Sequence, residues 1–158
     1  VEVSGKGEFP KTGLFNTATK VYFECVYESG ARLICTTIQD ETRQPSVRFE
    51  GTEGWVYATR DGIVSGPESL VREVIGPDEI RLERSPDHAQ NFVDCIRSRR
   101  RPVADVEIGH RSATVCHLGN IAMLLGRRLR WDPVREEFIG DADANRMKSR
   151  PRRAPWRV

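Results

Sequence analysis

The sequence lacks the short motifs by which several classes of enzyme are recognised. It has no P-loop, no GxSxG nucleophile elbow and no HExxH zinc motif, and no GxGxxG segment joins a strand to a helix. Gly5 and Gly7 are followed by Pro10, which excludes the helix that a dinucleotide-binding loop requires. We therefore expect this chain alone to hold no cofactor, no metal ion and no catalytic residue.

Long apolar runs and closely spaced cysteines are also absent. No hydrophobic stretch approaches the ~20 residues of a membrane span, and the N-terminus lacks the basic head and apolar core of a signal peptide. The cysteines Cys25, Cys35, Cys95 and Cys116 form no CxxC pair. A disulfide between Cys25 and Cys35 is the alternative, but we expect buried free thiols and hence a cytoplasmic protein.

Histidine is scarce, with three residues in the chain. His110 and His117 share a face of one predicted helix, but lie about 10 Å apart along its axis, too far to bind one metal ion. We expect His110 to cap or flank the start of the helix and His117 to make a buried hydrogen bond. With Thr114 and Asn120 they form a polar stripe, which faces a second subunit, a missing domain, a ligand or solvent.

Length and composition indicate a single globular domain covering residues 1–158. Hydrophobic residues make up 38% and charged residues 30%, which argues against disorder. The net charge of +2 favours no acidic partner, although ten Lys or Arg against five Asp or Glu lie in 127–158. That basic end is either a docking tail or a solvated one. The chain begins at Val1 in strand-like sequence, and we expect an excised or processed piece.

The first part of the chain, about residues 1–66, is rich in predicted strands. These strands are expected at 1–9 (an edge strand), 19–27, 32–38, 47–49, 55–58 and 63–64. Ser29–Gly30 and Asp61–Gly62 are hairpin turns, the second with a type I′ signal. The alternating residues that share a face are Val21, Phe23, Cys25 and Tyr27, and in the returning strand Ile34, Thr36 and Ile38.

The region of about 85–148 is predicted to be mainly helical. Ser85 is the expected N-cap of a helix with Pro86 at its first position and a core face of Phe92, Cys95 and Ile96. Further elements are a helix at 107–125 closed by Gly126, a strand at 129–131, a helix at 141–148 and an extended basic tail at 149–158 anchored by Trp156. The apolar stripe of the long helix is Leu118, Ile121, Ala122 and Leu125. Strands before helices predict an α+β fold, an open-faced, mainly antiparallel sheet with helices packed on one face.

The basic run Arg99–Arg101 invites a nucleic-acid interpretation. It lies at the C-terminus of a predicted helix, where cations complement the helix dipole, and no aromatic residue is interleaved with it. We therefore expect no nucleic-acid partner.

Four segments carry a resemblance to a known family. The long run NFVDCIRSRRRPVADVEIGHRSATVCHLGNIAMLLGRRLRWDP and the tail ANRMKSRPRRAPW, supported by PKTGLFNTAT and VRFEGTEGWVY, resemble the C-terminal domain of Gfo/Idh/MocA oxidoreductases. The resemblance is to the bacterial-type branch common in planctomycetes, and it covers essentially the whole chain.

The resemblance implies a parent enzyme with two domains. An N-terminal Rossmann domain binds NAD or NADP, and the sheet domain shapes a sugar or cyclitol pocket and supplies a homo-oligomer interface through its sheet face. Family catalysis uses a lysine of a Glu-Lys-Pro motif with an aspartate and a histidine further along, and this sequence has no Glu-Lys-Pro. The chain is therefore expected to be inactive without its Rossmann domain. The alternative is a stand-alone, non-catalytic binding or interaction module with the same fold.

The resemblance also indicates where a substrate is contacted. The polar residues Lys11, Thr12 and Asn16 lie in the region that borders the substrate pocket in the family. His117 and Asn120, on the polar stripe, are the weaker candidates.

Overall fold

The computed structural model describes residues 1–37, 45–150 and 152–155. The chain divides into two compact units, Val1–Ile38 with Ala104–Val158, and Gln39–Val103. A single domain over 1–158 stays a prediction. The expectations for Ile38 and for the anchor Trp156 lie outside the described residues.

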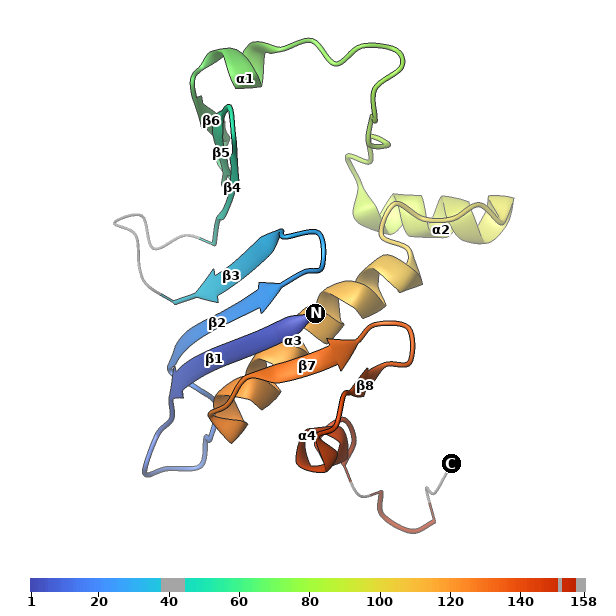
Figure 1. Ribbon diagram of the computed structural model, residues 1–158. Coiled ribbons are helices and arrows are strands. Elements are labelled where there is room, and N and C mark those ends of the chain that lie inside the picture. Colours follow the sequence, from blue (N-terminus) through green and yellow to red (C-terminus); the bar gives the residue numbers. More distant parts are fainter. Residues whose placement is uncertain (38–44, 151, 156–158) are drawn as a thin grey trace. The chain divides into compact units, whose positions relative to one another are not determined.

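The first unit contains a five-stranded antiparallel sheet. Its strands, in spatial order, are β3 (Arg32–Thr36), β2 (Lys20–Val26), β1 (Glu2–Glu8), β7 (Leu129–Asp132) and β8 (Glu137–Phe138) (Figure 1). The predicted hairpin at Ser29–Gly30 is confirmed, with Gly30 at a φ of 85°. The prediction of an edge strand at 1–9 is wrong, because β7 pairs with the outer side of β1. Glu2 faces Arg130 in that pairing, a long-range contact that local sequence does not reveal.

The long helix α3 (Val106–Leu125) covers one face of this sheet. It contacts β1 and β2 and runs behind them in Figure 1. The carboxylate of Asp105 caps its start by accepting hydrogen bonds from the amides of Glu107 and Ile108, at 2.9 and 3.4 Å. Gly126 ends it with a φ of 63°. The sequence expectation for this helix is confirmed, and so is the α+β arrangement of a sheet with a helix on one face.

The core lies between α3 and the sheet. Phe23 and Cys25 of β2 are buried, as the alternation predicts, with Val21 and Tyr27 partly buried beside them. Gly119 lets the helix approach, since a Cβ there would lie 2.5 Å from the ring of Phe23. The other buried members of the core are Val3, Leu118, Ile121, Ala122, Met123, Leu129, Trp131, Phe138 and Ala144.

The C-terminal part adds a strand that the sequence did not predict. β8 has two residues, and its Phe138 packs edge-on against Trp131 with ring centroids 5.0 Å apart. The side-chain amide of Asn145, in helix α4 (Ala142–Arg146), binds the backbone N–H and C=O of Phe138 at 2.9 and 2.7 Å. Asn145 thus supplies the hydrogen bonds that a further strand would give β8. The helix expected at 141–148 is confirmed in a shorter form, capped by Asp141.

The second unit contains a three-stranded antiparallel sheet. Its elements are β4 (Val47–Gly51), β5 (Gly54–Ala58) and β6 (Ile63–Gly66), with the helices α1 (Ser69–Arg72) and α2 (His88–Ser98). The hairpin at Asp61–Gly62 is confirmed, but its type I′ assignment is wrong. Four residues separate β5 from β6, and neither Asp61 nor Gly62 has the positive φ that type I′ requires.

Helix α2 differs from its prediction in two ways. Its N-cap is Asp87, whose carboxylate accepts a hydrogen bond from the amide of Gln90 at 2.9 Å, and not Ser85. Cys95 is buried, but Phe92 and Ile96 are 59% and 50% exposed, so the predicted core face is wrong for both. A 3.6-residue period predicts an apolar stripe on a helix and does not predict what covers that stripe.

Candidate functional site: the open face of the five-stranded sheet

The sheet face opposite α3 is rich in charge. Alternate residues of a strand point to opposite faces, and Val3, Phe23 and Cys25 point to the core. Their neighbours therefore lie on the open face. By the strand register, this open face consists of Glu2, Ser4, Lys6, Glu8, Lys20, Tyr22, Glu24, Val26, Arg32, Ile34, Thr36 and Arg130.

Cross-strand ion pairs organise this face. Lys20 lies 3.0 Å from Glu8, and Arg32 lies 2.5 Å from Glu24. The side chain of Glu24 is 18% exposed, and its hydrogen bond raises the pKa of the Arg32 guanidinium. Exposed pairs of this kind contribute little to stability, so their main effect is to define a charge pattern.

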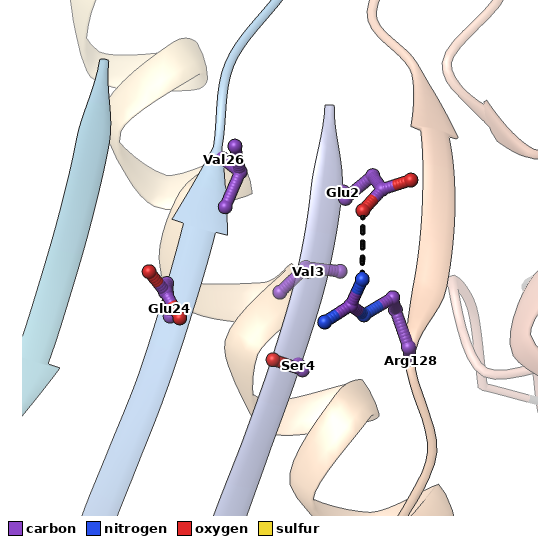
Figure 2. Close-up of a pocket in the computed structure, with 6 residues that line it drawn as sticks. All are labelled: Glu2, Val3, Ser4, Glu24, Val26 and Arg128. Carbon is purple, nitrogen blue, oxygen red and sulfur yellow. Dashed lines mark hydrogen bonds and ion pairs between the residues drawn. The ribbon is translucent and has the colours of Figure 1, made fainter. Parts of the chain in front are cut away.

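A small depression opens on this face beside the edge of β1. Figure 2 shows Arg128 reaching back to the carboxylate of Glu2, at 3.2 Å, along one wall. The volume of this depression is about 10 Å³, which admits about one water molecule, whereas ligand pockets measure about 300–1,000 Å³. The depression is therefore too small to enclose a sugar-sized ligand. The lining residues are Glu2, Val3, Ser4, Glu24, Val26 and Arg128.

The predicted substrate residues fall into two groups. Lys11, Thr12 and Asn16 share the exposed loop between β1 and β2, and His117 and Asn120 lie exposed on α3. Within the described residues, none of the five side chains makes a hydrogen bond or an ion pair. The buried hydrogen bond expected of His117 is wrong, because this side chain is exposed.

The loop also carries a feature that the sequence analysis missed. Leu14 and Phe15 lie within the same loop and are 101% and 82% exposed. A Leu-Phe pair flanked by turn-forming residues is the signal that would have drawn attention to it.

His110 takes part in a cluster at the tip of the β7–β8 hairpin, flanking the start of α3 as expected. Its Nε2 lies 2.6 Å from Oε1 of Glu136, and Nη1 of Arg111 lies 3.6 Å from the same oxygen. Nζ of Lys148 donates to the backbone carbonyl of Glu136 at 2.8 Å. The hydrogen bond from His110 is the main cause that lowers the pKa of Glu136. Within the predicted polar stripe, Thr114 donates its hydroxyl to the backbone carbonyl of His110.

Helices α2, α3 and α4 each begin at an aspartate cap that disfavours a dinucleotide. A pyrophosphate binds to free amides at a helix N-terminus, where the helix dipole favours negative charge. The side chains of Asp87, Asp105 and Asp141 occupy those amides in α2, α3 and α4, and their own negative charge repels a phosphate. No group of three or more His, Cys, Asp or Glu in the described part of the chain is placed to hold a metal ion. No described helix is both long and apolar enough to cross a membrane.

Two curated proteins show weak similarity to part of the chain. One is the large oxygenase component of a 2,4-dinitrotoluene dioxygenase system from Burkholderia sp. (strain RASC), 27% identical over 89 residues, which are 56% of this chain and 20% of that protein. The other is the large oxygenase component of a naphthalene 1,2-dioxygenase system from Pseudomonas fluorescens. It is 23% identical over 104 residues, which are 65% of this chain and 23% of that protein. The chain thus spans between a fifth and a quarter of these relatives. No solved structure shows significant similarity.

A family model gives a match of much greater extent. Residues 11–158 match the model described as the C-terminal alpha/beta domain of an oxidoreductase family, Gfo/Idh/MocA. The antiparallel sheet with α3 on one face agrees with that description. This chain belongs to the Gfo/Idh/MocA oxidoreductase family, as its C-terminal alpha/beta domain.

Proposed function

We propose that this chain is the substrate-shaping and oligomerisation domain of an NAD(P)-dependent oxidoreductase that acts on a sugar or cyclitol. The observation that carries the proposal is the family match over residues 11–158. The four free cysteines are consistent with the reducing cytoplasm as its compartment.

In this proposal the nucleotide is bound by a Rossmann domain that partners this one, and the chain alone is inactive. Hydride transfer needs a cofactor held against the substrate with a proton relay within reach. The aspartate caps of α2, α3 and α4 argue against a nucleotide pyrophosphate at the N-termini of these three helices.

An activity assay tests this division of labour. The purified chain is incubated with NAD or NADP and a panel of polyols, and NADH or NADPH formation is followed by absorbance, with the full-length parent as positive control. We expect turnover by the parent and none by the chain. Turnover by the 158 residues alone would contradict the proposal.

The loop between β1 and β2 is proposed to border the substrate in the parent. Its support is the set of exposed polar groups, Lys11, Thr12 and Asn16, whose side chains have no hydrogen-bond partner in the described residues. Lys11→Met in the parent is expected to raise KM at least tenfold, since one lost hydrogen bond to a substrate costs about 1.5 kcal/mol. Thr52→Ala, in the β4–β5 turn, is the matched control. An unchanged KM for Lys11→Met would contradict the proposal that this loop borders the substrate.

The open face is proposed to contact a second copy of the chain. Tyr22 and Ile34 are 41% and 52% exposed among the ion pairs, which gives the surface apolar area beside charges that set its register. Light scattering after size exclusion is expected to report a dimer or larger oligomer, which Ile34→Asp dissociates. The control Val134→Asp changes a residue that is 90% exposed in the β7–β8 turn and is expected to leave the oligomer intact. A monomeric wild type at every concentration contradicts the interface.

The coding sequence upstream of Val1 separates this proposal from the stand-alone module. A segment with GxGxxG and Glu-Lys-Pro in the same reading frame supports the two-domain oxidoreductase. A start codon immediately before Val1 supports the module instead.

A further inference from the structure

The loop between β1 and β2, residues 9–18, has a well-anchored base. The backbone N–H and the hydroxyl of Thr19 both donate to the backbone carbonyl of Glu8, at 2.8 and 3.1 Å. Phe9 packs partly buried against the core, and a Cβ at Gly7 would lie 2.9 Å from its ring. A surface loop whose two ends lie close together on a fixed scaffold is a common carrier of binding residues.

The tip of this loop presents an aromatic ring to solvent. Leu14 and Phe15 follow Gly13, whose φ of 100° turns the chain, and they are 101% and 82% exposed. The face of an aromatic ring carries negative charge and attracts the weakly positive hydrogens of C–H groups. The exposed ring of Phe15 is therefore available to a ligand with a flat C–H surface.

Polar side chains lie on both sides of the ring in the sequence. Lys11, Thr12 and Asn16 are all within four residues of Phe15, and none of them makes a hydrogen bond or an ion pair in the described part of the chain. Their ammonium, hydroxyl and amide groups match the hydroxyl groups of a ligand. Lys11 is the single charged residue in 9–18, so the loop lacks the cluster of cations that typically binds a phosphate.

The size of the apolar tip favours a small ligand over a protein partner. Leu14 and Phe15 together offer at most roughly 400 Å² of side-chain surface. A stable protein interface buries about 800 Å² on each partner. A single aromatic side chain, by contrast, covers one face of a monosaccharide ring, and a few nearby polar groups then fix its orientation.

We propose that Phe15 is a specificity-determining residue whose ring stacks on the C–H face of a cyclic sugar or cyclitol. The hydroxyl groups of that ligand are bound by the polar side chains of the same loop. This inference rests on the proposed function for the class of ligand, and it adds the residue that recognises the ring.

Stacking makes the loop selective for rings. A six-membered ring with equatorial hydroxyls presents its axial C–H bonds as a flat apolar face. An open-chain polyol has the same hydroxyl groups but no such face. Phe15 therefore favours a cyclic ligand over its open-chain counterpart, a distinction that hydrogen bonds to the hydroxyls alone do not make.

Saturation-transfer NMR on the intact chain tests the proposal. The probes are methyl β-D-glucopyranoside, which is locked as a ring, and sorbitol, its open-chain counterpart. We expect saturation to reach the glucopyranoside and to concentrate on the axial protons of one ring face, with little transfer to sorbitol. Absence of transfer to the glucopyranoside, or equal transfer to both probes, overturns the proposal.

Substitutions at the tip separate stacking from other apolar contact. Phe15→Ala and Phe15→Leu are expected to abolish the transfer, whereas Phe15→Trp retains it. Leu14→Ala, the matched control, is also expected to retain it. Because Leu14 and Phe15 are exposed, all four variants are expected to keep the Tm of the wild type. Transfer that survives in Phe15→Leu overturns the proposal, and so does dissociation of an oligomer by Phe15→Ala, which would show that the tip contacts a second copy.

The outcome is independent of the activity assay on the parent enzyme. Turnover of a polyol by the parent, without transfer to the ring probe in the chain, overturns the role of Phe15 and leaves the proposed function standing. Transfer that depends on Phe15, with no turnover by the parent, supports the stacking site and contradicts the proposed oxidoreductase activity.

Discussion

His110 and Glu136 join the start of α3 to the turn between β7 and β8. The imidazole Nε2 of His110 lies 2.6 Å from the carboxylate of Glu136, although 26 residues separate them in the chain. Glu136 itself has a φ of 52°, which is unusual for a residue with a side chain. The contact thus connects the helix to the two-stranded end of the sheet at a turn with a demanding backbone conformation.

This contact predicts a dependence of stability on acid. The hydrogen bond from His110 and the nearby charges of His110, Arg111 and Lys148 hold the pKa of Glu136 below the ordinary value of a glutamate. A carboxylate with a lowered folded-state pKa stabilises the fold above its unfolded pKa, and this contribution is lost as the pH falls through the folded pKa. Glu136→Gln removes the contribution. The Tm difference between wild type and Glu136→Gln is therefore expected to shrink as the pH falls below about 5.

Thermal scans from neutral pH to about pH 2 measure this difference. Glu53→Gln, in the exposed β4–β5 turn, is the control and is expected to follow the wild type at every pH. A difference between wild type and Glu136→Gln that stays constant down to the lowest pH counts against the role of the pair.

Two glycines of α3 predict opposite effects of the same substitution. A Cβ at Gly119 would lie 2.5 Å from the Phe23 ring, so Gly119→Ala is expected to lower the free energy of unfolding by about 1–3 kcal/mol. A Cβ at Gly109 meets nothing within 4 Å, so Gly109→Ala is expected to raise it by about 0.5–1 kcal/mol through helix propensity. Urea unfolding measures both. Equal effects of the two substitutions would show that α3 does not pack as closely on β2 as the structure has it.

The N-terminal cap of α2 predicts that two nearby substitutions differ in their effect on helix stability. Asp87→Ala removes the carboxylate that accepts from the Gln90 amide and is expected to destabilise the helix by about 0.5–2 kcal/mol. Ser85→Ala removes a hydroxyl that donates a hydrogen bond to the backbone carbonyl of Asp87 at 3.3 Å, and it is expected to change the stability of the helix much less. Hydrogen exchange of the amides in 88–98 reports the local stability. Faster exchange in Ser85→Ala than in Asp87→Ala would restore Ser85 as the cap.

Local patterns in the sequence predicted the elements whose causes are local. The alternation in β2 predicted its buried face, and the Gly126 signal predicted the end of α3. Position within the sheet was not predictable in this way. β1 is a central strand because β7 pairs with it, more than a hundred residues later in the chain. The cap of α2 was misplaced because both Ser85 and Asp87 are good cap residues, and only the backbone conformation distinguishes them.

In the candidate site too, the sequence predicts features with local causes but not those that depend on long-range contacts. Alternation alone predicts that Glu24 lies on the face opposite Phe23. The ion pair between Glu2 and Arg128 joins residues 126 positions apart, and nothing in either local sequence indicates the other. The resemblance pointed to Lys11, Thr12 and Asn16, which the structure places in one exposed loop without testing what they contact.

The short strand β8 leads to the last prediction. Phe138 is 1% exposed and packs on the ring of Trp131, so truncation leaves a cavity in the core. Phe138→Ala is expected to lower the free energy of unfolding by about 3–5 kcal/mol. Its neighbour Ile139 is 47% exposed, and Ile139→Ala is expected to cost about 0.5 kcal/mol or less. Urea unfolding of the two variants compares them directly. A mild effect of Phe138→Ala would mean that this two-residue strand packs outside the core, and that α3 and the other four strands of the sheet suffice for the fold.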